Sequence, residues 1–138
     1  MTRKKKLQKP SELLNLYSKK LNAAIEKKQS FFTFQLDFQY KNLESVYVSG
    51  YVVFRTGWIL EFNEIIKQQK TEVIKVKYRY HLMDKAKQLI FRYDNVAHHP
   101  EVTSYPHHKH VKSKVTESKP PGLLQVIDEV ESLIVKEK

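Results

Sequence analysis

The chain has 138 residues, enough to bury the core of one ordinary domain. Its 25 Lys and Arg outnumber 15 Asp and Glu, which gives a formal net charge of +10 and favours polyanionic partners such as nucleic acid, or an acidic protein. It contains no cysteine, which excludes disulfides and thiol chemistry, and no apolar run long enough to span a membrane, so we expect a cytoplasmic protein that has no membrane contact.

The amino-terminal residues are predicted to form a basic arm followed by a helix. Residues 1–10, MTRKKKLQKP, carry five Lys and Arg and no acid. From Ser11, a plausible N-cap, apolar residues recur at helical spacing, so we expect a helix over residues 11–28. We therefore divide the chain into an arm at residues 1–10 and a single domain at residues 11–138.

Five strands are predicted to follow this helix. Phe32, Phe34, Leu36 and Phe38 alternate with polar residues, which is typical of a strand with one buried face. Residues 45–70 are predicted to form two strands around a tight turn at Thr56 and Gly57, and further strands are expected in residues 71–84 and 88–95. Because the connections are too short for parallel crossovers, we expect an antiparallel meander.

The last third of the chain is predicted to be a loop and then a helix. Four prolines interrupt residues 96–121, so we expect an irregular, histidine-rich loop there. From Leu123 onward, apolar residues again recur at helical spacing. The predicted fold is a two-layer α+β domain, in which a five-stranded antiparallel meander sheet is combined with an N-terminal and a C-terminal helix.

Histidines are concentrated in the stretch FRYDNVAHHPEVTSYPHHKH, residues 91–110, which holds five of the six in the chain. Pro100 and Pro106 restrict the backbone of the two limbs that carry them, so the imidazoles can take a defined arrangement. The stretch begins at the end of a predicted central strand, where functional side chains are commonly mounted.

A metal-independent ribonuclease is the function that these residues favour. Cleavage of RNA needs one group to take a proton, another to give one, and cations to hold the charge that builds on phosphorus. Imidazoles titrate near neutral pH and can play either proton role, and a carboxylate can orient one of them. The predicted catalytic residues are His98, His99, His108, His110 and Asp94, and the predicted phosphate- and RNA-binding residues are Arg92, Lys109, Arg55, His107, Tyr93 and Tyr105.

Other interpretations remain open at this stage. A divalent metal could be held by His98, His108 and His110, although Lys109 among them disfavours a dication, so no cofactor is favoured. The protein could instead be a non-catalytic basic RNA-binding module, or an interaction protein for an acidic partner. His81, on the preceding strand, either reaches the loop or is an ordinary strand histidine, and its neighbour Arg79 shares its face.

The segment YRYHLMDKAKQLIFRYDNVAHHPEVTSYPHHKHV resembles the signature of the TumE family, toxin components of bacterial and archaeal toxin-antitoxin pairs. The resemblance covers residues 30–135. Ala97 departs from the pattern, in which a proline often precedes the paired histidines. The motif residues that the chain retains are Arg92, Asp94, His98, His99, His107, His108 and His110.

This resemblance implies a partner and an activity. The implied partner is a small antitoxin of helix-turn-helix type, and the implied activity is toxicity through RNA cleavage. It leaves open whether the protein forms a homo-oligomer.

Overall fold

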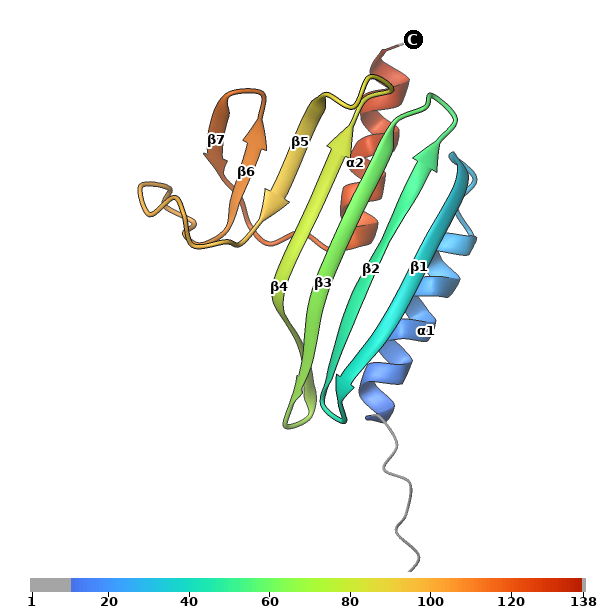
Figure 1. Ribbon diagram of the computed structural model, residues 1–138, viewed down its shortest axis with the longest axis vertical. Helices are drawn as coiled ribbons and strands as arrows, with labels where there is room; N and C mark the ends of the chain where they lie inside the picture. The colour runs from blue at the N-terminus through green and yellow to red at the C-terminus, as the bar shows by residue number, and fades with distance from the viewer. Residues whose placement is uncertain (1–10, 138) are drawn as a thin grey trace, which may run out of the picture.

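The computed structural model describes residues 11–137, so the predicted basic arm lies outside the described residues. Two helices and one antiparallel sheet make up this part of the chain, and both helices lie on the same face of the sheet (Figure 1). The strands follow one another across the sheet in chain order. The elements are α1 Glu12–Glu26, β1 Phe31–Asn42, β2 Ser45–Phe54, β3 Ile59–Gln69, β4 Glu72–Met83, β5 Leu89–Asp94, β6 His108–Val111, β7 Lys114–Glu117 and α2 Leu123–Lys136.

The sheet has seven strands, so the predicted number of five was wrong, whereas the α+β class, the antiparallel sheet and both helices are confirmed. The two additional strands, β6 and β7, lie within the segment 96–121 that was expected to be irregular. Each has four residues and little apolar character, HKHV and KVTE, and they are joined by a turn in which Lys112 has a positive φ of 55°. They form because β6 pairs with the edge of β5, a contact that the local sequence pattern does not predict.

The two faces of the sheet differ in character. The helix-covered face is apolar, with Val48, Leu60 and Leu82 fully buried. Helix α1, capped by Ser11, packs there through Leu14 and Ile25. Because side chains alternate along a strand, the residues between these point to the opposite face, which neither helix covers. No helix among the described residues is long and apolar enough to cross a membrane.

The covered face also holds one buried acid. Glu64 is fully buried and accepts hydrogen bonds from the hydroxyls of Tyr17 in α1 and Tyr80 in β4. Lys75 lies 3.9 Å from the Glu64 carboxylate and donates to the Tyr80 hydroxyl at 2.6 Å. Burial lowers the pKa of Lys75 and raises that of both tyrosines. This network ties α1 to the sheet through satisfied polar groups.

The docking of α2 can be tested with two valines of the same helix. Val130 is fully buried against the sheet, whereas Val135 is 70% exposed. We expect Val130→Ala to lower the free energy of unfolding by about 2 kcal/mol, because it leaves a cavity in the core. Val135→Ala should change it by less than about 0.5 kcal/mol. Urea denaturation measures both, and equal losses would contradict the observed packing.

Candidate functional site

Two rows of polar side chains cross the uncovered face of the sheet. Lys109 and Tyr93, which are paired on β6 and β5, both contact Glu129 of α2, so they face the helices. Their neighbours along each strand therefore point to the uncovered face. In register across the sheet, the first row is Asp37, Ser49, Asn63, Arg79, Asp94 and His108, and the second is Gln35, Tyr51, Glu61, His81, Arg92 and His110.

A pocket of about 400 Å³ opens where these rows meet the histidine segment. Its residues come from β4, β5, β6 and the connection between β5 and β6. Three of its imidazoles, those of His99, His108 and His110, have ring centroids 4.8 to 5.4 Å apart. The pocket is lined by Arg79, Arg92, Asp94, Val96, His98, His99, His108 and His110.

The carboxylate of Asp94 organises this pocket. Asp94 is only 4% exposed, and its Oδ1 lies 2.8 Å from His108 Nε2 and accepts the backbone N–H of Val96 at 3.0 Å. Its Oδ2 forms an ion pair with Arg92 Nε at 3.1 Å and lies 3.8 Å from His110 Nε2. One buried acid therefore fixes a guanidinium and one imidazole, and it lies beside a second imidazole.

His108 is held on both sides. Its Nδ1 lies 2.9 Å from the carbonyl oxygen of Pro106, and its Nε2 faces Asp94. Both neighbours are hydrogen-bond acceptors, so the ring satisfies them only when both nitrogens carry protons and it is a cation. With 2% exposure, His108 is suited to positioning and to holding positive charge, rather than to exchanging protons with a bound ligand.

His99 and His110 are both more accessible than His108, and His98 is exposed. His99 Nδ1 lies 3.0 Å from a carboxylate oxygen of the exposed Glu101. His110 Nε2 lies 3.3 Å from Arg92 Nη2. Burial, followed by the positive charges of Arg92 and His108, lowers the pKa of His110, so its ring is neutral and able to accept a proton at neutral pH.

Several predicted residues lie elsewhere. Lys109 faces α2 and donates to Glu129 at 2.6 Å, together with the Tyr93 hydroxyl. His107 also lies on the helix side, where its ring stacks on Tyr78 and its Nδ1 lies 2.8 Å from the Tyr78 hydroxyl. Arg55 follows the last residue of β2, away from Ser49, which is the β2 residue in register with Asp94, and it does not line the pocket. Tyr105 is 46% exposed and does not line the pocket.

Sequence reasoning attached no site role to Arg79, and it left the direction of His81 open. The alternation along β4 puts both on the uncovered face, where they are paired with Asp94 and Arg92. Burial and the charges of Arg79 and Arg92 lower the pKa of His81. The alternation was visible in the sequence, but the pairing of β4 with β5 was needed to bring Arg79 into the histidine pocket.

The position of Lys109 bears on the metal alternative. Its charge was the reason for disfavouring a dication, yet it lies on the other face of the sheet. The ligand atoms of His99, His108 and His110 lie within 4.8 Å of one another, so the structure groups His99 with the two strand histidines. Two features disfavour a metal cation: the positive charge of Arg92 inside the pocket, and the contacts that already occupy both ring nitrogens of His108.

Comparison with known proteins gives the family. A family model described as toxin TumE matches residues 21–138. The chain belongs to this toxin family. No curated protein and no solved structure matches it. In this TumE-family chain, six of the seven motif residues recognised in the sequence line one pocket, and the seventh, His107, lies on the helix side.

The electrostatics of the pocket can be tested by histidine titration. Arg92 faces both His81 and His110, whereas Arg79 lowers the pKa of His81 alone. Loss of a nearby cation makes the imidazolium easier to form. We therefore expect Arg92→Gln to raise both pKa values, and Arg79→Gln to raise only that of His81. Proton NMR of the histidine ring protons measures them, and an unchanged His110 in Arg92→Gln would contradict the arrangement.

The organising role of Asp94 predicts a loss of stability. Asp94→Asn leaves Arg92 and His108 without their counter-charge, so we expect the free energy of unfolding to fall by about 3 kcal/mol. Asp128→Asn is the matched control, because it removes an exposed acid paired with Lys28 and should cost less than about 1 kcal/mol. Similar losses in urea denaturation would show that Asp94 does not hold the site.

Proposed function

We propose that the protein is the toxin of a toxin-antitoxin pair and acts as a metal-independent ribonuclease through the histidine pocket. The observation that carries this proposal is the convergence of two accessible imidazoles, His99 and His110, beside the guanidinium of Arg92. A pair of imidazoles supplies both proton transfers of RNA cleavage, and the guanidinium holds the phosphate.

The environments of the two imidazoles suggest which role each plays. His110 has a lowered pKa and is the base that takes the proton from the ribose 2′-hydroxyl. His99 is oriented by the carboxylate of Glu101 at its Nδ1, and in this proposal it is the acid that protonates the leaving 5′-oxygen. The 2′-oxygen bonds to phosphorus as the bond to the 5′-oxygen breaks, which leaves a 2′,3′-cyclic phosphate and a 5′-hydroxyl.

Three cations supply electrostatic stabilisation in this proposal. Arg92 and Arg79 both line the pocket, and His108 adds the positive charge that its two acceptors require. Charge that develops on the phosphate oxygens is stabilised most where the cations are already in place. Asp94 is then a positioning residue, because it orients Arg92 and His108 and does not reach the reacting atoms itself.

A partner follows from membership of a toxin family. The toxin is neutralised by a small antitoxin of helix-turn-helix type, whose acidic surface would complement the net charge of +10. A homo-oligomer is compatible with this proposal.

A second candidate function rests on the grouping of three histidines. A divalent metal could take His99, His108 and His110 as nitrogen ligands, as in zinc sites that keep a fourth position for water. His108 would first have to release Asp94.

Binding of RNA without cleavage is the outcome expected of a non-catalytic basic module.

The ribonuclease proposal is tested with purified protein and single-stranded RNA in a chelator. His99→Gln and His110→Gln should each lower the cleavage rate by about 10²- to 10⁴-fold, and the rate of the wild type should show a bell-shaped pH profile. His107→Gln, which changes the same residue type on the other face of the sheet, should retain activity within about threefold.

Three results would overturn the proposal. Cleavage that survives both substitutions would remove the two imidazoles from the reaction. Cleavage that a chelator abolishes and added Zn²⁺ restores would establish the metal alternative. RNA that is bound but left intact by the wild type would identify the protein as a non-catalytic binding module.

A further inference from the structure

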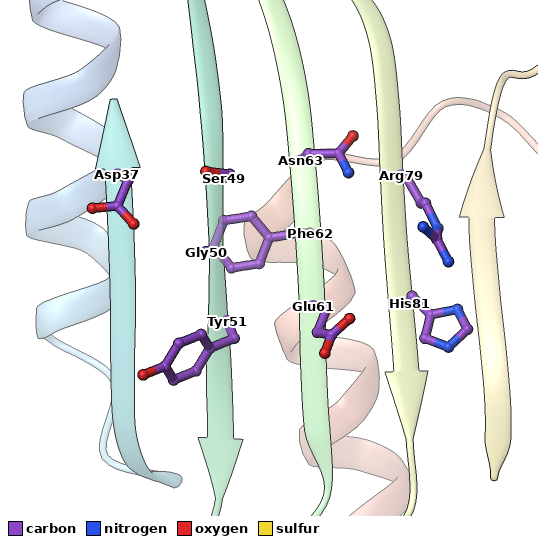
Figure 2. Close-up of a pocket in the computed structure, with 9 residues that line it drawn as sticks. All are labelled: Asp37, Ser49, Gly50, Tyr51, Glu61, Phe62, Asn63, Arg79 and His81. Carbon is purple, nitrogen blue, oxygen red and sulfur yellow. The ribbon is translucent and has the colours of Figure 1, made fainter. Parts of the chain in front are cut away.

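A second pocket opens on the uncovered face, next to the histidine pocket (Figure 2). Its volume is about 240 Å³, below the range of about 300 to 1,000 Å³ typical of sites for drug-sized ligands, and of a size suited to one flat ring system. Arg79 lines both pockets, so a ligand in one lies beside the cations of the other. It is lined by Asp37, Ser49, Gly50, Tyr51, Glu61, Phe62, Asn63, Arg79 and His81.

Gly50 and Phe62, which are paired on β2 and β3, lie at the floor of this pocket. A Cβ at this position would lie 2.0 Å from the carbonyl oxygen of Gln35 and 3.0 Å from the Phe62 ring. Glycine therefore lets β1 and β2 approach closely here, and Figure 2 shows the Phe62 ring beside it. Gly50 and Phe62 alternate along their strands with Tyr51 and Glu61, so both are directed to the helix-covered face, and the polar side chains of the uncovered face stand around the pocket.

Polar groups around this floor are free to bind a ligand. Glu61 and Asn63 are neighbours on the uncovered face of β3, with Phe62 between them in the chain. Among residues 11–137 neither side chain has a hydrogen-bond or ion-pair partner. The Nδ1 of His81 is buried and has no hydrogen-bond partner in the same part of the chain. A buried polar atom without a partner is uncommon, and a ligand that binds here would supply one.

Aromatic rings flank the carboxylate of Glu61. Tyr51 lies on one side of it in register and His81 on the other, and Tyr51 is 38% exposed. Sequence-specific proteins take unstacked RNA bases between such rings and read their Watson–Crick edges. Figure 2 shows Arg79 and His81 directed toward β5, where the histidine pocket begins.

We propose that this pocket binds a guanine base of the RNA whose phosphate occupies the histidine pocket. An ionised carboxylate only accepts hydrogen bonds, so Glu61 selects an edge with two adjacent donors. Guanine offers such an edge in N1–H and the 2-amino group, whereas adenine, cytosine and uracil do not. The amide of Asn63, beside Glu61, donates to the guanine O6.

The neighbouring cations favour a nucleotide over a protein partner. Arg79 lies between the base pocket and the histidine pocket, where a phosphate attached to the bound nucleoside would sit. This inference rests on the proposed function for the identity of its ligand, but it assigns selectivity to residues that take no part in the proton transfers.

The inference is tested by binding of short single-stranded 2′-O-methyl oligonucleotides, which lack the 2′-hydroxyl needed for cleavage. Each carries one guanine, inosine or adenine in a run of uridines, and fluorescence anisotropy gives the dissociation constants. The wild type should bind the guanine oligonucleotide about tenfold more tightly than the adenine one, with inosine between them because it lacks the 2-amino group.

Glu61→Gln should remove this preference. The amide cannot accept both donors, so affinity for the guanine oligonucleotide should fall about tenfold while the adenine oligonucleotide is bound as before or more tightly. Glu72→Gln is the matched control: it removes one negative charge from an exposed strand end outside both pockets and should leave the preference unchanged. Circular dichroism confirms that both variants are folded.

Equal binding of guanine and adenine by the wild type would overturn the inference, as would equal effects of Glu61→Gln and Glu72→Gln. So would unchanged oligonucleotide affinity in Glu61→Gln combined with loss of antitoxin binding, since the pocket would then serve a protein partner. His110→Gln should keep the guanine preference while it loses cleavage. A wild type that binds guanine selectively but cuts no RNA refutes the ribonuclease alone, whereas cleavage without base preference refutes the guanine pocket alone.

Discussion

The ion pairs of Asp94 with His108 and Arg92 are the contacts on which the arrangement of the histidine pocket depends. The pair with His108 joins the end of β5 to the start of β6, where the two strands also pair through their backbones, and the pair with Arg92 lies within β5. A buried carboxylate needs compensation for the loss of its hydration, and here two cationic groups and one backbone N–H provide it. Because each partner is a member of the site, the groups that stabilise the acid are the groups that it orients.

The two faces of the sheet hold their charged groups in different environments. On the covered face, Lys109 and the Tyr93 hydroxyl bind Glu129, and Glu64 is satisfied by Tyr17 and Tyr80. These contacts dock the helices. On the uncovered face, Arg79, Arg92 and the histidines of the pocket have no helix above them and line open pockets. A sequence that places charged and apolar residues at alternate positions thereby gives the same strands one apolar face that packs against the helices and one polar face that carries the pockets.

The residue types in the candidate site could be predicted from the sequence, but which individual residues line it could be predicted only in part. Asp94, Arg92, His99 and His110 were singled out because their residue types suit phosphate chemistry, and the structure brings them together. Lys109 and His107 stood beside them in the chain, and the structure puts both on the other face. Adjacent residues of an extended segment point in opposite directions. Residues that are neighbours in the sequence can therefore lie on opposite faces of the sheet.

The sequence by itself determined the helices and the first five strands, because the spacing of apolar residues within each segment shows which of its faces is buried. It also determined that imidazoles, a carboxylate and guanidinium groups occur together near residue 100. Only the tertiary structure decided that β6 and β7 exist, because β6 gains order from pairing with β5, and β7 from pairing with β6, rather than from their own patterns. It likewise brought Arg79 beside Asp94, a neighbour 15 positions away, because cross-strand register is set by backbone hydrogen bonds between distant residues.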